Sequence, residues 1–341
     1  MPISNSSPRL RGVRMREVAE KAGVSRMTVS RALNQPEKVT EALRLRVLSA
    51  VSELGYVHNH LARSLSSDRS TIIGLVLPSL DNSIFAQTLR GISDVLRPAG
   101  FQLMVAESAD DAEEEERVIA AFLSQRLAGL ILHGTRHSEA AMRMLRGAGI
   151  PVVETGDMSS MPIDMVVSYS NRAAAKAMTL HLARLGYARI AFAGLARNPR
   201  AMERELGYRE ALAELGVASE PRMAVAVSRG LAGGAEAVGH VARSLPDADA
   251  LFCAGDVLAP GALFECRKRG WAVPERLAIA SFDDVELLRH VAPAITTLRL
   301  PRYEIGERTA QMLLSRIIDG AGHLKGNVVD LKFEVIQRES A

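Results

Sequence analysis

The sequence predicts an all-α helix–turn–helix headpiece followed by an α/β core of two lobes with parallel sheets. The stretch REVAEKAGVSRMTVSRALN, residues 16–34, indicates two short helices interrupted by Gly23-Val24. From residue 71, continuous apolar runs alternate with helical stretches, which is the pattern of parallel strands covered on both faces. About 270 residues of this pattern exceed one domain of typical size, so we expect two lobes.

Each headpiece helix has one apolar side. The first helix buries three small residues, Val18, Ala19 and Ala22. Ser25 stands at the N-cap of the second helix, where its hydroxyl can accept from a free backbone N–H. The second helix turns three residues inward at i, i+3 and i+4 spacing, namely Val29, Ala32 and Leu33. Its opposite face consists of Arg26, Met27, Ser30, Arg31 and Asn34. A third helix is expected from Thr40 to Leu54.

Helix pairs with a central glycine are common, so an ordinary helical hairpin is the alternative to a DNA-binding motif. The distribution of charge along the chain helps to choose between these two interpretations. Residues 1–70 carry 12 basic and six acidic side chains, a net charge of +6. The other 271 residues carry 30 basic and 33 acidic side chains, a net charge of −3. A basic segment gains affinity for DNA by releasing counterions from the phosphates, so the charge favours DNA as the partner of the headpiece.

The core elements are expected in alternating order after residue 71. Apolar runs predict strands at 71–77, 102–106, 129–133, 151–154, 188–194, 224–227, 250–255 and 277–284. The first four are separated by predicted helices at 83–97, 112–126 and 138–147. VVDLKFEVI, near the C-terminus, is typical of one more strand.

Composition argues against a membrane, secreted or disordered protein. Hydrophobic residues make up 48% of the chain, and no apolar run reaches the ~18 residues of a membrane span. The first ten residues lack the apolar stretch of a signal peptide, so we expect a cytoplasmic protein. Cys253 and Cys266 fit two buried thiols better than a disulfide framework or a zinc site.

Motifs of enzymes and metal sites are missing from the sequence. It has no P-loop, no dinucleotide-binding glycine motif, no H-E-x-x-H and no G-x-S-x-G. Glu113 to Glu116 are consecutive and fan around a helix start, where negative charge suits the helix dipole. His58 and His60 have no Cys or carboxylate cluster nearby. We therefore expect no catalytic residue, no metal and no cofactor.

Residues 16–65 resemble the headpiece of the lac repressor family of bacterial transcription regulators. The resemblance is carried by the stretches VAEKAGVS, TVSRALN and GYVHNHLARSL. The chain departs from that pattern twice. Arg14 stands where a Thr usually caps the first helix, and His58 stands where Pro often precedes the hinge Asn59. Core stretches such as VLPSLDNSIFAQTLRGI (76–92) and APAITTLRLPRYEIGERTAQMLL (292–314) are also similar to the family.

The resemblance implies a periplasmic-binding-protein-like core, in which three crossovers join two lobes around a cleft for a small molecule. We expect a flexible basic tail at 1–13, a headpiece at 14–57, a hinge helix or linker at 58–70 and a core at 71–341. The N-lobe would comprise about 71–168 plus 299–322, and the C-lobe about 169–297 plus 325–338. Because the sequence has no C-terminal heptad tail, we expect a homodimer rather than a tetramer.

DNA contacts are expected from the exposed face of the second helix. Arg26, Met27 and Arg31 are placed to contact bases, because Arg can bind guanine bidentately and Met can touch a thymine methyl group. Ser25, Thr28 and Asn34 are more suited to phosphates, which position the protein without specifying sequence. A solvated helix face is the alternative for the two arginines.

The segment Asn59–Leu65 resembles the family's hinge helix. In the family, a Leu at the position of Leu65 wedges into the minor groove at a central CG step and kinks the DNA. The predicted DNA-binding set therefore also includes Tyr56, Asn59, Ala62 and Leu65, and the operator is expected to be palindromic and CG-centred. The alternative is a plain linker whose Leu65 packs on the core.

Four core residues are candidates for binding a small-molecule effector. Arg204 and Asp283 match effector-binding positions of the family, and Phe85 matches a position that packs the ligand. Arg229 lies near a place where relatives carry an aromatic residue, and an extra cation there favours a sugar acid. The alternatives are a structural ion pair for Arg204 and Asp283 and an ordinary surface position for Arg229.

The function implied is a ligand-responsive repressor of carbohydrate catabolism genes. PSLDNSIFAQTLRGI, GIPVVE and GALFECRKRG are similar to family members that repress gluconate utilisation, so gluconate or a related sugar acid is the expected releasing effector. Asp283-Asp284 follows the wider family instead of that subgroup. The alternatives are a different sugar or purine effector, an effector that acts as corepressor, and a sugar-binding transport protein, which the basic headpiece disfavours.

Overall fold

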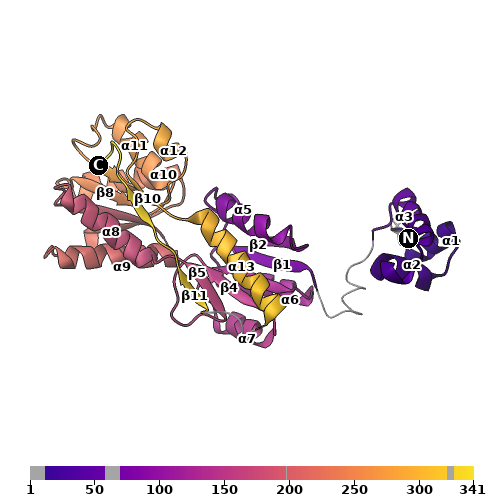
Figure 1. Cartoon of the computed structure of the whole chain (residues 1–341). Helices are drawn as coiled ribbons and strands as arrows, with labels where there is room; N and C mark the ends of the chain where they lie inside the picture. The colour runs from indigo at the N-terminus through magenta and orange to yellow at the C-terminus, as the bar shows by residue number, and fades with distance from the viewer. Residues whose placement is uncertain (1–11, 58–69, 197, 321–325) are drawn as a thin grey trace, which may run out of the picture. The chain divides into compact units, whose positions relative to one another are not determined.

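The chain divides into two compact units, Met1–Ser70 and Thr71–Ala341. A computed structural model describes residues 12–57, 70–196, 198–320 and 326–341 (Figure 1). The predicted hinge positions Asn59, Ala62 and Leu65 lie outside these ranges, as does most of the predicted tail. Among the helices of the described part, none is long and apolar enough to cross a membrane.

The first unit is a three-helix headpiece. Its helices are α1 (Met15–Ala22), α2 (Arg26–Asn34) and α3 (Glu41–Leu54), with a short 3-10 turn, η1 (Pro36–Lys38), between the last two. Gly23 and Gly55 end α1 and α3 in the left-handed conformation, which glycine adopts without steric cost. The three helices share a small core of seven buried residues, Val18, Ala19, Ala22, Val29, Ala32, Val47 and Ala50.

The N-lobe of the second unit contains a six-stranded parallel sheet in the order β11-β5-β4-β3-β1-β2. Its strands are β1 (Ile72–Leu77), β2 (Gln102–Glu107), β3 (Gly129–His133), β4 (Val152–Thr155), β5 (Met165–Ser168) and β11 (Val328–Asp330). Alternate residues of a strand point to opposite faces. Leu75 therefore packs with α5 (Phe85–Leu96) and α13 (Arg302–Asp319), and Val76 packs with α6 (Ala112–Ser124) and α7 (Glu139–Gly147).

The C-lobe contains a four-stranded parallel sheet in the order β7-β6-β8-β9. Its strands are β6 (Ile190–Leu195), β7 (Ala224–Val227), β8 (Ala250–Cys253) and β9 (Ala278–Ala280). One face packs against α8 (Asn171–Arg184) and α9 (Pro199–Glu214), and the other against α10 (Leu231–Ser244) and α11 (Leu258–Lys268). The short helices η2 (Pro221–Met223) and α12 (Leu287–His290) lie in connections.

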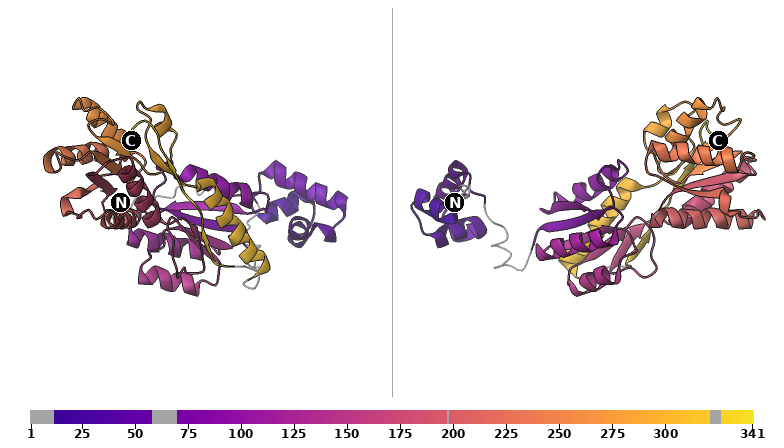
Figure 2. Two further views of the ribbon diagram at one scale, coloured as in Figure 1. Left: turned by 60° about the vertical axis from the view of Figure 1, so that its left-hand side comes forward. Right: turned by 180° about the vertical axis from the view of Figure 1, so that it is seen from behind.

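Three chain segments cross between the lobes, which appear as separate bodies in Figure 2. The first runs from β5 into α8, and the second from β10 (Thr297–Arg299) into α13. The third joins β11 to β12 (Glu334–Ile336), which pairs antiparallel with β10. The predicted parallel two-lobed architecture is thus confirmed.

Three details of the strand prediction were wrong. VVDLKFEVI is not one strand but two, β11 and β12, which belong to different sheets. Strand β5 was not predicted, because four buried residues after a polar loop give too short an apolar run to stand out. The predicted strands 250–255 and 277–284 also end early, at Cys253 and Ala280, and their last residues lie in the loops that follow.

Candidate functional site

The outward face of α2 has the composition expected of a base-contacting surface. Ser25 caps the helix, since its Oγ accepts from the Thr28 backbone N–H at 3.1 Å. Arg26, Met27 and Arg31 are exposed opposite the buried positions of the helix, and the Met27 side chain is 64% exposed. An exposed apolar side chain flanked by two arginines suits contacts with the edges of base pairs in the major groove.

The other side chains of the headpiece that are predicted to contact DNA already make contacts within the headpiece itself. The Thr28 hydroxyl lies 2.9 Å from the Ser25 hydroxyl, and Asn34 Nδ2 donates to Ser30 Oγ at 3.3 Å. Tyr56 is half-buried against the headpiece core. Arg14 offers α1 no acceptor, but Glu17 accepts from the Arg14 backbone N–H at 2.7 Å, so half of a capping box is present.

Arg204 projects from α9 and is almost fully buried. Its Nε donates to Asn171 Oδ1 at 2.8 Å and its Nη1 to the Ala254 carbonyl at 2.9 Å. Its guanidinium lies 3.6 Å from the centroid of the Phe282 ring, within the range of a cation–π contact. Asn171, at the start of α8, therefore links the first crossover to Arg204.

Asp283 forms its ion pair with Arg302. The pair between Asp283 and Arg204, which the sequence analysis gave as an alternative, is not formed. Arg302 begins α13, directly after the second crossover, and is itself buried. Asp283 has a φ of 66°, a left-handed backbone that is uncommon for a side chain larger than glycine. The pair thus lies where the C-lobe meets a crossover segment.

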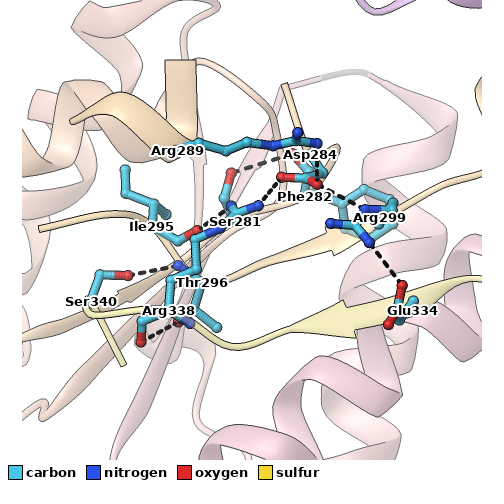
Figure 3. A network of polar contacts seen from close by, with 10 residues as sticks. All are labelled: Ser281, Phe282, Asp284, Arg289, Ile295, Thr296, Arg299, Glu334, Arg338 and Ser340. Carbon is cyan, nitrogen blue, oxygen red and sulfur yellow. Dashed lines mark hydrogen bonds and ion pairs between the residues drawn. The ribbon is translucent and has the colours of Figure 1, made fainter. Parts of the chain in front are cut away.

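The carboxylate of Asp284, next in the chain, holds this loop in place (Figure 3). It accepts from Arg289 at 2.8 Å, from Arg299 at 3.0 Å and from Arg338. Arg299 also donates to Glu334 of β12 at 3.1 Å, so the network joins the loop to both strands of the β10–β12 pair. Burial opposes the charge, but these three hydrogen bonds lower the pKa of Asp284.

Phe85 opens α5 and is buried, with its ring edge-on to the His133 ring at a centroid distance of 4.8 Å. His133 ends β3 and also lines a cavity of about 160 Å³ between the lobes. The cavity is lined by Ser108, Asp110, Asp111, Ala112, Glu115, His133, Gly134, Thr135, Arg136, Asp157, Pro199 and Arg200. The four predicted effector residues are not in this lining, although Phe85 contacts it through His133.

Three guanidinium groups act on the His133 ring. Burial lowers the pKa of His133 well below its ordinary value, and the nearby guanidinium groups of Arg200, Arg302 and Arg204 lower it further. His133 is therefore a neutral ring at physiological pH, among three cations. Asp157, which also lines the cavity, accepts from the Asn171 backbone N–H at 3.1 Å and so connects the cavity to Arg204 through Asn171.

Charged pairs also span the cleft. Asp110 of the N-lobe accepts from Asn198 Nδ2 at 3.0 Å and from Arg229 at 3.0 Å, both on the C-lobe. The Arg229 side chain is 47% exposed. Arg136 of the N-lobe pairs with Glu203 of α9. Arg229 thus contacts the opposite lobe and is not in the lining of the cavity.

Sequence reasoning missed His133, Arg200, Arg302 and Asp110. The signal for two of them was present, because His133 ends β3 and Asp110 follows β2. Ligands of parallel α/β sheets bind beyond the carboxyl ends of the strands, so polar residues at these positions are candidates. Arg200 and Arg302 carried no such signal. Among the described residues, no group of three or more His, Cys, Asp or Glu side chains is placed to hold a metal ion.

A helix–turn–helix headpiece joined to a two-lobed core with a charged interlobe cavity defines a DNA-binding regulator that responds to a small molecule. The comparisons agree with this class. The family model for bacterial regulatory proteins of the lacI family matches residues 14–59, and that for a periplasmic binding protein-like domain matches residues 179–341. The chain belongs to the lacI family, and it is a DNA-binding transcriptional repressor of that family and not an enzyme.

Individual relatives align over almost the whole chain. This chain is 37% identical over 303 residues to the HTH-type transcriptional regulator GntR of Escherichia coli (strain K12), and the alignment covers 89% of this chain and 91% of the relative. It is 36% identical over 328 residues to GntR of Pseudomonas aeruginosa, covering 96% and 95%. The crystal structure of a lacI-family regulator from Silicibacter pomeroyi matches with a TM-score of 0.89 at 36% identity, covering 96% of this chain and 99% of that one.

Proposed function

We propose that this repressor controls genes of carbohydrate catabolism and that gluconate or a related sugar acid releases it from its operator. The observation that carries the effector assignment is the group of buried guanidiniums, Arg200, Arg204 and Arg302, around the cleft. Asp283 balances one of these charges by pairing with Arg302. An anionic ligand between the lobes would be attracted by the remaining positive charge, whereas a neutral sugar would leave it uncompensated.

Three of the predicted effector residues keep their roles in this proposal. Arg204 binds the carboxylate or a neighbouring oxygen, Asp283 accepts from ligand hydroxyls, and Phe85 packs the ligand together with His133. The mixed lining of the cavity supports a polyhydroxy acid, because carboxylates such as Asp157 are natural acceptors for hydroxyl groups. Arg229 is assigned instead to joining the lobes through Asp110.

On the DNA side, we propose that two headpieces of a homodimer bind a palindromic, CG-centred operator. Arg26, Met27 and Arg31 contact bases, and Ser25, Thr28 and Asn34 contact phosphates. Tyr56, with Asn59, Ala62 and Leu65 of the hinge, completes the interface. The exposed basic and apolar face of α2 supports the base-contacting role.

A ligand screen with an operator readout tests the proposal. Thermal shift of the full chain with gluconate, neutral sugars and purines identifies the ligand class, since a ligand of the folded state raises the midpoint. Fluorescence anisotropy on operator DNA then gives the sign of the response. We expect gluconate to raise the midpoint and weaken operator binding. A response to a neutral sugar or purine alone, or tighter operator binding with gluconate, would contradict the proposal.

A further inference from the structure

The arginines of the cleft differ in how far their charges are already satisfied. Arg204 donates two hydrogen bonds and lies over Phe282, and Arg302 is paired with Asp283. Arg229 is half-exposed and bound to Asp110. Neither Arg204 nor Arg302 is in the lining of the cavity, and each already has close protein partners.

Arg200 is the exception. It follows Pro199 at the start of α9, lines the cavity, and has a side chain that is only 14% exposed. Within the described part of the chain, its ion-pair partner is Asp110, at 3.6 Å. That separation exceeds a good N–H···O hydrogen bond, and the same carboxylate already accepts from Asn198 and Arg229 at 3.0 Å. The Arg200 guanidinium is therefore incompletely compensated.

The surroundings of Arg200 make its charge costly without an anion. Burial lowers its pKa, the charge of Asp110 acts in the opposite direction, and the like charges of Arg204 and Arg302 lower it further. The first turn of α9, with Pro199 also in the cavity wall, adds the positive end of a helix dipole. A carboxylate in the cavity would relieve this repulsion and supply acceptors for the free donors.

We propose that Arg200 binds the carboxylate of the effector and sets the preference of the protein for a sugar acid over the corresponding neutral sugar. Arg204 then holds a neighbouring oxygen and orients the ligand. The lining also contains Asp111, Glu115 and Asp157, whose carboxylates can accept hydrogen bonds from the hydroxyl groups of the ligand. The volume, about 160 Å³, lies below the roughly 300–1,000 Å³ of pockets for larger ligands, so one small metabolite fills it.

This inference rests on the proposed function, and the test separates the two. Isothermal titration of the full-length protein would measure the affinities of gluconate and of glucitol, the neutral polyol with the same number of carbons. Three variants are compared with the wild type: Arg200→Gln, Arg200→Lys and, as a matched control, Arg229→Gln. The control removes a shorter contact to the same Asp110 carboxylate, and Arg229 itself is not a lining residue of the cavity. Operator binding without ligand checks that each variant is folded.

We expect Arg200→Gln to weaken gluconate binding by ~30-fold or more, because it leaves the ligand charge unpaired in a buried site. Glucitol binding should not weaken, since like-charge repulsion in the empty cleft is relieved. Arg200→Lys should retain much of the gluconate affinity, and Arg229→Gln should change it by less than ~3-fold, within the range of an exposed ion pair.

Two results would overturn the assignment to Arg200. The first is gluconate binding to Arg200→Gln as tight as to the wild type, which would mean that the carboxylate is held elsewhere. Alternatively, Arg229→Gln could weaken gluconate as much as Arg200→Gln, in which case Arg200 acts only through Asp110 and the closure of the lobes. A wild-type protein that binds glucitol but no sugar acid would overturn the proposed effector class itself, together with the role given to Arg200.

Discussion

Single residues of α2 are our proposed source of discrimination between operators, because the headpiece core is made of small apolar groups without base-contacting chemistry. Val29 and Ala32 are buried, while Arg31 one position away is exposed. A bidentate arginine can distinguish guanine from the other bases, whereas a phosphate contact cannot. Arg31 therefore offers a direct test of which kind of contact the exposed face makes.

We predict that Arg31→Ala weakens binding to the specific operator by ~1–3 kcal/mol and relaxes the preference at one base pair in each half-site. The measurement is anisotropy titration against the operator, its single-base variants and random DNA at fixed salt. An equal loss on specific and random DNA would assign Arg31 to a phosphate.

A second residue-scale prediction concerns His137, which is buried in the N-lobe between two glutamates. Its Nδ1 lies 3.0 Å from the Glu115 carboxylate, and its Nε2 lies 3.4 Å from Glu154. Burial opposes the imidazolium, but the hydrogen bonds and charges of Glu115 and Glu154 raise the pKa of His137 to about 9. Because this lies above the ordinary value of 6.5, the group stabilises the fold fully below pH 6.5, and this contribution is lost as pH rises through about 9.

His137→Gln should accordingly lower the free energy of unfolding by on the order of 3 kcal/mol near pH 6 and by much less at about pH 9.5. Urea denaturation of wild type and variant at both values measures the difference, and titrations elsewhere in the chain cancel between them. A loss that is the same at both pH values would mean that the charge of His137 contributes nothing.

At the scale of elements, the positions of the proposed effector residues depend on how α8 and α9 pack. α9 carries Arg200 and Arg204, and α8 begins with Asn171, the partner of Arg204. The two helices approach closely at Gly207, where an added Cβ would lie 2.0 Å from the carbonyl oxygen of Arg172. The obstacle is backbone, so a side chain here would displace one helix relative to the other.

Gly207→Ala should therefore destabilise the core by at least ~1–3 kcal/mol and weaken gluconate binding, since Arg204 moves with α9. Gly147→Ala is the matched control, because its Cβ would meet nothing within 4 Å at the end of α7. That change should be neutral or stabilising by up to ~1 kcal/mol. Urea denaturation and titration of both variants provide the comparison, and equal stabilities would refute the close-packing argument.

At the scale of the whole molecule, regulation requires that the ligand and the operator favour different arrangements. Cross-lobe contacts such as Asp110 with Arg229 and Arg136 with Glu203 exist only while the lobes are close together. An effector that binds between the lobes favours this arrangement, and any coupling to DNA binding must be equal in both directions. Loss of an effector contact should then remove the response without removing operator binding.

We predict that Arg204→Ala binds the operator like the wild type but is no longer released by gluconate, since truncation at a buried charged contact costs ~2–5 kcal/mol of ligand affinity. Operator titrations with and without gluconate give the result. A variant that is still released at the wild-type gluconate concentration would remove Arg204 from the effector site, while the assignment of the protein to its family would stand.

Local signals in the sequence determined the headpiece. Its caps, glycine turns and i, i+4 spacing act within a few residues, so Ser25 as N-cap and α2 as an amphipathic helix could be predicted without any tertiary contact. The strands of the core were equally visible as apolar runs, because strands buried on both faces need apolar residues on both sides.

The cavity that we propose as the effector site was decided by the tertiary structure. Asp110 comes from a loop and His133 from the end of β3 in one lobe, and Arg200 comes from a helix of the other; three crossovers far apart in sequence bring them together. The crossovers also split VVDLKFEVI between two sheets and paired Asp283 with Arg302 instead of Arg204. Strand pairing and the partner of a buried charge depend on which distant segments pack together, and a periodicity measured over a few residues contains no information about that.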